Sequence, residues 1–222
     1  MTTPFFPHNL LRINNNLEVK ENKLGPFTYY SMDNFFNEAD HLNKMLESSY
    51  APATMMPSWK NTTASSRNFK DYFDCRMNLN LDQHDFEEEN NTVNFLKNTF
   101  NIKGECTFVG FNLFTWINTP KQNIQFCPHL DDSINILIYL DRYSSGGTAL
   151  YEDSINNVEI EPYNIQFNIE DLKNTPHVIP AKFNRCVIFN GSIPHGGYID
   201  NHKIYSNGNW RYNAVYFFKW QN

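Results

Sequence analysis

The sequence lacks several features that mark other classes of protein. Its 222 residues include only four cysteines, which lie far apart without a C-x-x-C pair: Cys75, Cys106, Cys127 and Cys186. This spacing indicates reduced thiols and not a disulfide framework, as is usual in the cytoplasm. No apolar stretch approaches the ~20 residues that a membrane-spanning helix requires, and residues 1–10 lack the basic and apolar regions of a signal peptide. We therefore expect a cytoplasmic protein that binds no membrane.

An excess of basic residues is missing as well. The chain has 18 Lys and Arg against 24 Asp and Glu, with a formal net charge of −6, so nothing indicates a protein that binds nucleic acid through its phosphates. What is present is typical of a folded protein, with 41% hydrophobic and 16% aromatic residues. A chain of this length can bury one sizeable core. We expect one domain over 1–222, with a helical or irregular part at 1–104 and a β-rich core at 105–220.

The N-terminal part is expected to flank that core. The segment Asp33–Leu46 has one apolar stripe at helical spacing, and Asp33 is a plausible N-cap. A second amphipathic helix is expected over Asp85–Thr99. Between the two, Ser48–Asn68 combines prolines with many polar residues, which predicts a long loop. Such a loop is either a lid or binding loop over a site or a disordered connector.

From residue 105 onwards the pattern changes to short β-prone segments separated by turn residues. One of them, Ile134–Leu140, is nearly all apolar, as in a strand that is buried on both faces. The expected strands are Cys106–Ile117, Phe126–Asp131, Ile134–Leu140, Thr148–Tyr151, Val158–Asn168, Val178–Pro180, Cys186–Phe189 and Tyr212–Trp220. Strands this closely spaced favour a jelly-roll or barrel-like double sheet. The expected fold class is therefore α+β and mainly β, with N-terminal flanking helices.

A His-x-Asp pair lies on one of these expected strands. His129 and Asp131 are two residues apart, so their side chains point to the same side of the strand. One imidazole nitrogen and one carboxylate oxygen make two thirds of a metal site, and His195, delivered from another strand, completes it. Two His and one carboxylate leave open positions on the metal, which suits non-haem Fe(II) and oxygen chemistry.

Other residues compete for two of these roles. His177 is the main competitor for the second imidazole, but it lies between an acidic loop and a strand without following glycines, which favours a structural hydrogen-bonding role. Asp132 is the alternative to Asp131, although its side chain should point to the opposite face of the strand.

An arginine opens the last β-prone segment, directly before Tyr212. Arg211 is followed by aromatic and aliphatic residues, and an arginine that points inwards from such a strand needs an anionic partner. The carboxylate of a bound cosubstrate is a natural candidate.

Five segments, in this order, resemble the Fe(II)/2-oxoglutarate-dependent oxygenases, in particular the prolyl-hydroxylase-like branch: PHLDD, INILIYLD, SSGGTALYE, CVIFNGSIPHGG and WRYNAVYFF. The resemblance covers roughly residues 105–220, and the segment Asp33–Leu46 is similar to the family's opening helix. It implies a double-stranded β-helix core of the jelly-roll or cupin-like type. It also implies Fe(II), 2-oxoglutarate and O2 as reactants, with ascorbate as a further candidate cofactor.

The resemblance also assigns roles to individual residues. The family's iron triad is matched by His129, Asp131 and His195. Because Asp131 supplies the carboxylate whose place a halide takes in halogenating relatives, the implied reaction is hydroxylation. The implied substrate is an amino acid, a peptidyl residue or another small molecule, and the products include succinate and CO2.

Further positions are assigned to the cosubstrate. Arg211 matches the basic residue that pairs with the distal carboxylate of 2-oxoglutarate, and Tyr139 matches a tyrosine that donates to the same carboxylate in some members. Asn112 or Trp116 is expected to line the cosubstrate pocket. For Tyr139, a core tyrosine satisfied by the backbone remains the alternative.

The sequence departs from the family pattern in one place. The interval between His195 and Arg211 is longer than in many prolyl-hydroxylase-like members, and Asn201–Asn209 looks like an inserted hairpin tip, which we expect near the mouth of the site. Nucleic-acid demethylases of the superfamily share a long interval but carry another arginine six residues on, where this chain has Phe217. That difference and the negative net charge disfavour a nucleic-acid substrate. The remaining alternative is a non-catalytic β-helix protein that binds a ligand or partner and keeps a vestigial site.

Overall fold

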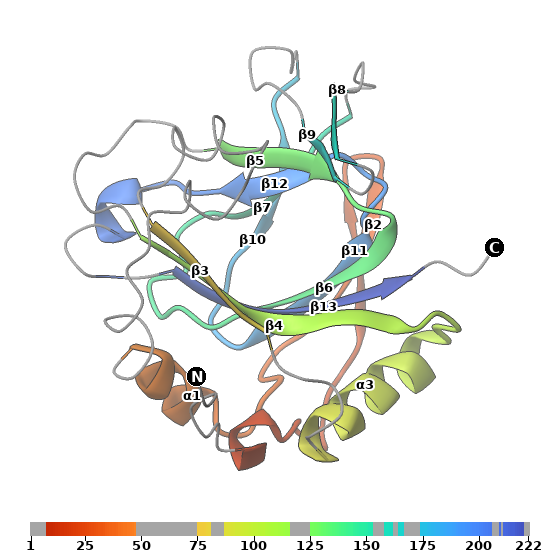
Figure 1. Cartoon of the computed structure of the whole chain (residues 1–222), viewed down its shortest axis with the longest axis vertical. Coiled ribbons are helices and arrows are strands. Elements are labelled where there is room, and N and C mark those ends of the chain that lie inside the picture. Colours follow the sequence, from red (N-terminus) through yellow and green to blue (C-terminus); the bar gives the residue numbers. More distant parts are fainter. Residues whose placement is uncertain are drawn as a thin grey trace.

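Two antiparallel β-sheets face each other across the interior of the protein (Figure 1). The structure is a computed structural model, and it describes residues 8–47, 75–80, 87–115, 125–152, 158–161, 164–166, 174–205, 209 and 211–219. The larger sheet has the order β1 (Lys20–Leu24), β2 (Phe27–Met32), β11 (Arg185–Asn190), β6 (Ser133–Tyr139), β13 (Arg211–Lys219), β4 (Cys106–Thr115) and β3 (Cys75–Asn80). The smaller sheet has the order β10 (His177–Pro180), β7 (Gly147–Leu150), β12 (His195–Tyr198), β5 (Gln125–Leu130), β9 (Asn164–Gln166) and β8 (Val158–Glu161).

The chain alternates between the two sheets through most of its C-terminal part. Strands β4, β6, β11 and β13 belong to the larger sheet. The chain enters the smaller sheet between each two of them, as β5, as β7 to β10 and as β12. All of these neighbours pair antiparallel. This is the topology of a jelly roll, so the predicted fold class is confirmed.

The apolar strand β6 has both of its faces buried, as its sequence predicted. Ile136 and Ile138 point away from the smaller sheet and belong to a core that also contains Leu42 and Leu96 from the helices. Tyr139, together with Val187, Phe189, Leu150 and other apolar residues, belongs to a second core between the sheets. Because side chains alternate between the two faces of a strand, β6 contributes to both hydrophobic cores.

The N-terminal helical segments cover the outer face of the larger sheet, as Figure 1 shows. They are α1 (Ala39–Met45), α3 (Glu87–Phe100) and the short 3₁₀ turn η1 (His8–Leu11). A further 3₁₀ turn, η5 (His202–Tyr205), precedes β13. The second predicted helix agrees closely with α3. Among the described residues, no helix is both long enough and apolar enough to cross a membrane.

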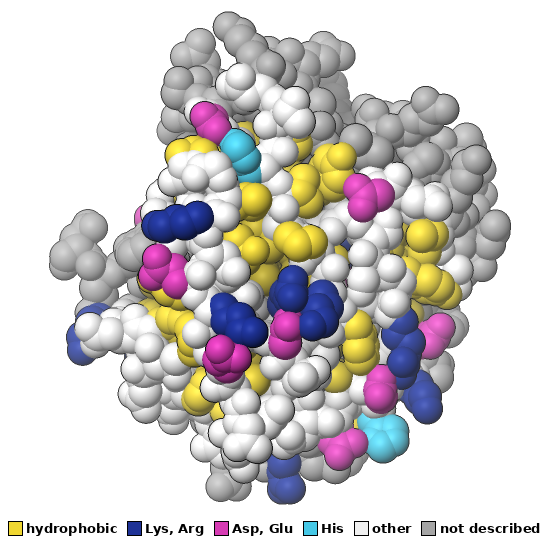
Figure 2. All heavy atoms as spheres, turned by 180° about the vertical axis from the view of Figure 1, so that it is seen from behind, with side chains coloured by type: hydrophobic (Ala, Val, Ile, Leu, Met, Phe, Trp, Pro, Cys, Tyr) yellow, Lys and Arg dark blue, Asp and Glu magenta, His cyan; other side chains and the backbone are white. Residues whose placement is uncertain are grey.

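Charged side chains of both signs are interspersed on the surface. On the face seen in Figure 2, Lys and Arg side chains lie beside Asp and Glu, and apolar side chains appear between them. This face has no continuous basic patch of the kind that binds a phosphate backbone.

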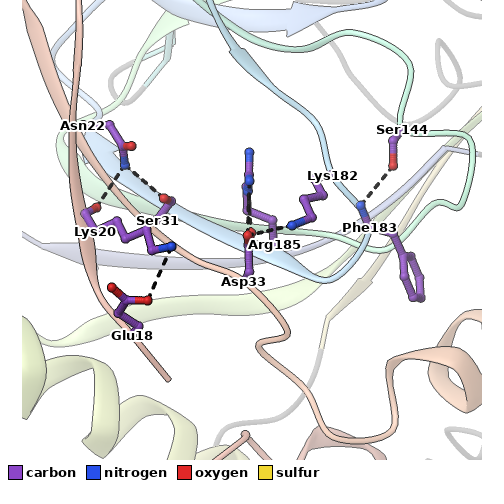
Figure 3. A network of polar contacts seen from close by, with 9 residues as sticks. All are labelled: Glu18, Lys20, Asn22, Ser31, Asp33, Ser144, Lys182, Phe183 and Arg185. Atoms are coloured by element: carbon purple, nitrogen blue, oxygen red, sulfur yellow. Dashed lines mark hydrogen bonds and ion pairs between the residues drawn. The ribbon is translucent and has the colours of Figure 1, made fainter. Parts of the chain in front are cut away.

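The first predicted helix begins later than expected. Asp33 does not cap it, because its carboxylate accepts hydrogen bonds from Arg185 at 2.7 Å and from Lys182 at 2.7 Å (Figure 3). Asn34 has a positive φ of 57°, which interrupts a right-handed helix. Helix α1 consequently starts at Ala39, with no side-chain cap at Glu38.

The expectation that residues 1–104 are helical or irregular is only partly right. They also contribute β1, β2 and β3, which extend the larger sheet at both ends. In the C-terminal part, the single strand expected over Val158–Asn168 is interrupted and forms β8 and β9. The loop expected at Ser48–Asn68 lies outside the described residues.

Candidate metal centre

Neighbouring strands bring the predicted triad together. His129 is the penultimate residue of β5, Asp131 follows the end of that strand, and His195 is the first residue of β12. The two strands pair antiparallel, with His129 directly opposite His195. Residues that are far apart in sequence thus share one end of the interior.

The distances within this cluster suit a shared cation. Oδ2 of Asp131 lies 3.5 Å from Nε2 of His129 and 3.3 Å from Nε2 of His195. Two ligand atoms at right angles, each about 2.1 Å from a metal ion, are about 3.0 Å apart. Among the described residues, these three are the His, Cys, Asp or Glu side chains that gather closely enough for a metal, with one ligand atom from each lying within 4.8 Å of the others.

The protonation states also suit a cation. Burial alone would raise the pKa of Asp131, but the neighbouring His129 above all outweighs it and holds that pKa below its usual range. Burial and the neighbouring His129 lower the pKa of His195. A lowered pKa favours the ionised carboxylate of Asp131 and the neutral imidazole of His195, and these are the forms that bind metals.

The backbone around the triad fixes its orientation. Nδ1 of His195 lies 2.8 Å from the carbonyl oxygen of Ile193, and because a carbonyl only accepts, Nδ1 carries the proton and Nε2 keeps its lone pair. The N–H of Asp131 donates to the carbonyl oxygen of Gly191 at 2.9 Å, and the N–H of Gly191 donates to that of Ser133 at 2.8 Å. A Cβ on Gly191 would lie 2.5 Å from the Ser133 carbonyl oxygen, so only glycine fits this turn.

A residue that the sequence did not reveal also touches the triad. Nδ2 of Asn135 lies 2.6 Å from Oδ2 of Asp131 and 2.9 Å from Nε2 of His195. Its Oδ1 accepts a hydrogen bond of 2.6 Å from the hydroxyl of Ser133. The sequence feature that could have revealed Asn135 is its position as a lone amide in an apolar strand, four residues after Asp131.

Arg211 lies between the sheets. Its side chain is buried, with the whole residue 3% exposed, and Nη2 donates to the carbonyl oxygen of Gly147 in the smaller sheet at 3.1 Å. The guanidinium carbon lies 6.0 Å from the centre of the Tyr139 ring. Gly147 is three residues from Leu150, which pairs with His195, so about 10 Å of strand separates the two ends of the interior.

The protein supplies an anion of its own near Arg211. Asp141 is buried, and its Oδ1 accepts hydrogen bonds from the Ser144 N–H at 2.9 Å and the Tyr205 hydroxyl at 2.7 Å. Burial raises the pKa of Asp141, and Arg211 opposes that rise. From the sequence, we expected a cosubstrate carboxylate to be the anionic partner of Arg211. The side chain of Asp141 supplies part of that partner within the protein itself.

Tyr139 is fully buried and makes a hydrogen bond within the protein. Its hydroxyl lies 2.7 Å from Oγ1 of Thr148 in the smaller sheet, and burial raises its pKa to about 12. Its hydroxyl bonds to a side chain and not to the backbone, so the expected core role is modified in that detail. The role towards a cosubstrate remains a prediction.

The structure leaves the role of the two residues that were expected to line the cosubstrate pocket, Asn112 and Trp116, as a prediction. Asn112 pairs in register with Asn213, but the structure describes only its backbone, and Trp116 lies outside the described residues. Asn213, which the sequence did not single out, is buried two residues after Arg211, and its Oδ1 has no hydrogen-bond partner among the described residues. The period of two that separates Asn213 from Arg211 on one strand face was the signal for it.

The competing residues take structural or surface positions. His177 pairs with Glu152 through Nε2 and packs edge-on against Phe27, and Asp132 is exposed. Within Asn201–Asn209, Tyr205 is fully buried, and its hydroxyl donates to Asp141.

Comparison with known proteins gives similarity of fold only. No family model matches the sequence, and no curated protein matches it. A Pseudomonas putida prolyl-4-hydroxylase is similar with a TM-score of 0.47 and 11% identity, over 89% of this chain and 95% of that chain. The ycfD protein of E. coli gives 0.47 and 10%, over 93% of this chain and 55% of that chain.

A third similar structure is an oxidoreductase of the 2OG-Fe(II) oxygenase family from Burkholderia pseudomallei. Its TM-score is 0.38 and its identity 10%, over 96% of this chain and 76% of that chain. Prolyl-4-hydroxylase and 2OG-Fe(II) oxygenase structures are thus among those that this chain is similar to. At these TM-scores and identities, the similarity assigns no activity.

Proposed function

We propose that this chain is a non-haem Fe(II) dioxygenase that uses 2-oxoglutarate as cosubstrate and hydroxylates a C–H bond of an amino acid, a peptidyl residue or another small substrate. One observation carries the proposal: two imidazoles and one carboxylate share the interior of a jelly roll with the buried guanidinium of Arg211. The first group has the chemistry of a metal site and the second has that of a carboxylate site.

The donor set suits a catalytic metal better than a structural one. Structural zinc sites are closed by four protein ligands, whereas catalytic sites keep positions open. His129, Asp131 and His195 supply three ligands, and this mixture of nitrogen and oxygen suits Fe(II). When bound, Fe(II) with 2-oxoglutarate and O2 supplies the oxidation of a C–H bond, with release of succinate and CO2.

Arg211 suits the distal carboxylate of the cosubstrate. A guanidinium can bind a carboxylate through two parallel hydrogen bonds, and the buried Asn213 and Tyr139 on the same interior face add polar groups beside it. The Asp141 carboxylate lowers the cost of burying the cation before a ligand binds. In this proposal, the Arg211 side chain orients the cosubstrate towards the triad.

Apolar residues limit the access of water to the triad. The ring of His195 packs edge-on against Phe189 at a centroid distance of 4.9 Å, and Leu150 lies opposite it on β7. His195 has a side-chain exposure of 5%, whereas His129 has 28%. A substrate would therefore approach from the side of His129, while the wall behind His195 stays dry.

A small or peptidyl substrate is favoured over nucleic acid. The net charge is −6, and acidic and basic side chains alternate on the face shown in Figure 2. Phe217 stands where nucleic-acid demethylases have a second arginine. That face shows no basic patch, and a net negative charge weakens the electrostatic attraction that dominates nucleic-acid affinity.

An anaerobic titration with Fe(II) and 2-oxoglutarate tests the proposal. Binding of both together should give the metal-to-ligand charge-transfer absorption of a chelated 2-oxo acid, and admission of air should then release succinate. A panel of free amino acids and peptides identifies the substrate by stimulation of succinate release. Binding without turnover of any substrate would favour the non-catalytic alternative, and absence of metal binding would refute both.

A further inference from the structure

Asn135 is an amide in the middle of an apolar region. It is 1% exposed on β6 and pairs in register with Phe189 on one neighbouring strand and Phe217 on the other. A buried amide in such surroundings is costly unless its donors and acceptor are satisfied. The partners that satisfy it therefore matter for any role that it has.

The side-chain amide of Asn135 bonds to the triad and its turn. The amide nitrogen lies 2.6 Å from Oδ2 of Asp131 and 2.9 Å from Nε2 of His195, and the amide oxygen accepts from Ser133. An ionised carboxylate only accepts hydrogen bonds, so the atom facing Asp131 must be the nitrogen. The carbonyl of Ile193 fixes the proton of His195 on Nδ1, so Nε2 offers a lone pair to the same nitrogen.

The two N–H groups of Asn135 are thus bound to two of the three atoms that would hold a metal. An imidazole nitrogen has a single in-plane lone pair, which it can give either to a hydrogen bond or to a cation. A carboxylate oxygen has two, so Asp131 can keep its bond to Asn135 while it binds a metal. Metal binding must therefore break the bond between Asn135 and His195, but not the one between Asn135 and Asp131.

We propose that Asn135 is a placeholder for the metal. It holds His195 and Asp131 in position in the metal-free protein and releases His195 when a cation binds. This inference rests on the metal site of the proposed function and adds to it a residue that regulates metal affinity. Asn135 acts through the two ligands and is a positioning residue.

The placeholder role predicts the direction in which the removal of Asn135 changes metal affinity. Asn135 makes one more hydrogen bond in the metal-free protein than in the metal-loaded one, so it stabilises the metal-free form more. Removing it should therefore raise metal affinity, about 2- to 10-fold for one neutral hydrogen bond. Tighter binding in turn increases the stabilisation that a given metal concentration provides. An amide with a purely structural role would leave the affinity unchanged.

Co(II) is a suitable probe, because its visible absorption reports coordination directly. The Kd for Co(II) and the metal-induced rise in Tm are measured for the natural chain and for Asn135→Ala. The matched control is Asn43→Ala. Asn43 is also buried, at 3% exposure, and it donates to the carbonyl oxygen of Leu140 at 2.7 Å on the side of the helices.

The expected result is a lower Kd and a larger metal-induced rise in Tm for Asn135→Ala, with neither change for the control. An unchanged or higher Kd would overturn the placeholder while leaving the metal site intact. Absence of Co(II) binding by both the natural chain and Asn135→Ala would overturn the metal site and the placeholder together. Binding by Asn135→Ala alone would support the placeholder.

A second measurement needs no variant. In the natural chain labelled with ¹⁵N, titration with Zn(II) should shift the side-chain amide proton of Asn135 that faces His195 by more than its geminal partner. The amide of Asn43 should not move. If both protons of Asn135 stayed unperturbed at saturating Zn(II), the placeholder would be wrong even where Asn135→Ala does not fold.

Discussion

His129 and His195 lie directly opposite each other on neighbouring antiparallel strands, with their ring centres 4.3 Å apart. Their pairing is part of the backbone register of β5 and β12, so the sheet itself determines how close the two imidazoles come. A register slip of one residue would turn one ring to the other face. Metal binding and the pairing of these strands should accordingly stabilise each other.

The first prediction concerns the triad. We expect His129→Ala, Asp131→Ala and His195→Ala each to lower metal affinity by more than the ~10–100-fold typical of residues outside the ligand shell. Succinate release should fall to background, while circular dichroism stays that of a folded protein. The control is His41→Ala, since His41 is exposed and pairs with Glu38 on α1. Retention of Co(II) binding by a variant that lacks both His129 and His195 would contradict the assignment.

The second prediction concerns Arg211. Losing charge-assisted hydrogen bonds worth ~1.5–3 kcal/mol each should weaken 2-oxoglutarate binding about tenfold to a few hundredfold per bond. We expect Arg211→Ala to raise the Kd for 2-oxoglutarate with little change in that for Fe(II). Arg211→Lys should fall in between, because it keeps the charge but loses the planar fork.

Arg142→Ala is the matched control for Arg211, because Arg142 is largely exposed and pairs with Asp40 on the surface. Its affinity for 2-oxoglutarate should equal that of the natural chain. If Arg211→Ala also bound as tightly as the natural chain, the cosubstrate assignment would fail and the ligand-binding alternative would gain support.

The third prediction concerns the turn beside Asp131. In Gly191→Ala the new methyl group would lie 2.5 Å from the carbonyl oxygen of Ser133 and 3.0 Å from Cβ of Asp131. The turn must shift, so we expect about a tenfold loss of Co(II) affinity and ~1–3 kcal/mol of stability. In Gly104→Ala a methyl group would meet the carbonyl oxygen of Lys219, which should cost stability but leave Co(II) affinity unchanged. Equal effects of both variants on affinity would refute the link.

The fourth prediction concerns pH. Hydrogen bonds from Arg185, aided by Lys182, lower the pKa of Asp33 to about 2, compared with ~3.9 in an unfolded chain. The folded protein therefore binds this proton less readily. The stabilisation is complete above about pH 4 and is lost as the pH falls through 2. The side chain of Asp33 is 31% exposed, so solvent screening limits the gain to about 1 kcal/mol or less.

Urea unfolding of the natural chain and of Asp33→Asn at several pH values between 6 and 2.5 tests this. The natural chain should be the more stable one at pH 6, and the difference should shrink as the pH falls. A difference that stays constant over this range would show that the ion pairs of Asp33 with Arg185 and Lys182, drawn in Figure 3, do not contribute to stability.

The sequence predicted those features that depend on residues close to one another in the chain. The continuous apolar run Ile134–Leu140 identified β6 and its two buried faces. The period of two within a strand placed His129 and Asp131 on one side. The start of α1 was mispredicted because Asp33 bonds to Arg185, a partner more than a hundred positions away. Helix propensity contains no information about such a contact.

The residues that were missed at the site have the same cause. Asn135 is an ordinary polar residue until the fold places it against His195, which belongs to the other sheet. Strand β12 begins with His195 and continues through two glycines, which are poor strand formers. The buried Asp141 beside Arg211 was also not foreseen, because only the fold brings a carboxylate at the end of one strand close to the start of another.

The hairpin of β1 and β2 has a consequence for solubility. It covers the edge of β11, the apolar strand RCVIFN, which pairs with β2 on one side and β6 on the other. The edge that the hairpin presents instead is KENKL, with Lys20 and Lys23 exposed. Charged edge strands discourage pairing with other chains. A chain that began after Met32 would expose the backbone of β11 and offer a template for intermolecular β-sheet, so aggregation would be its main failure.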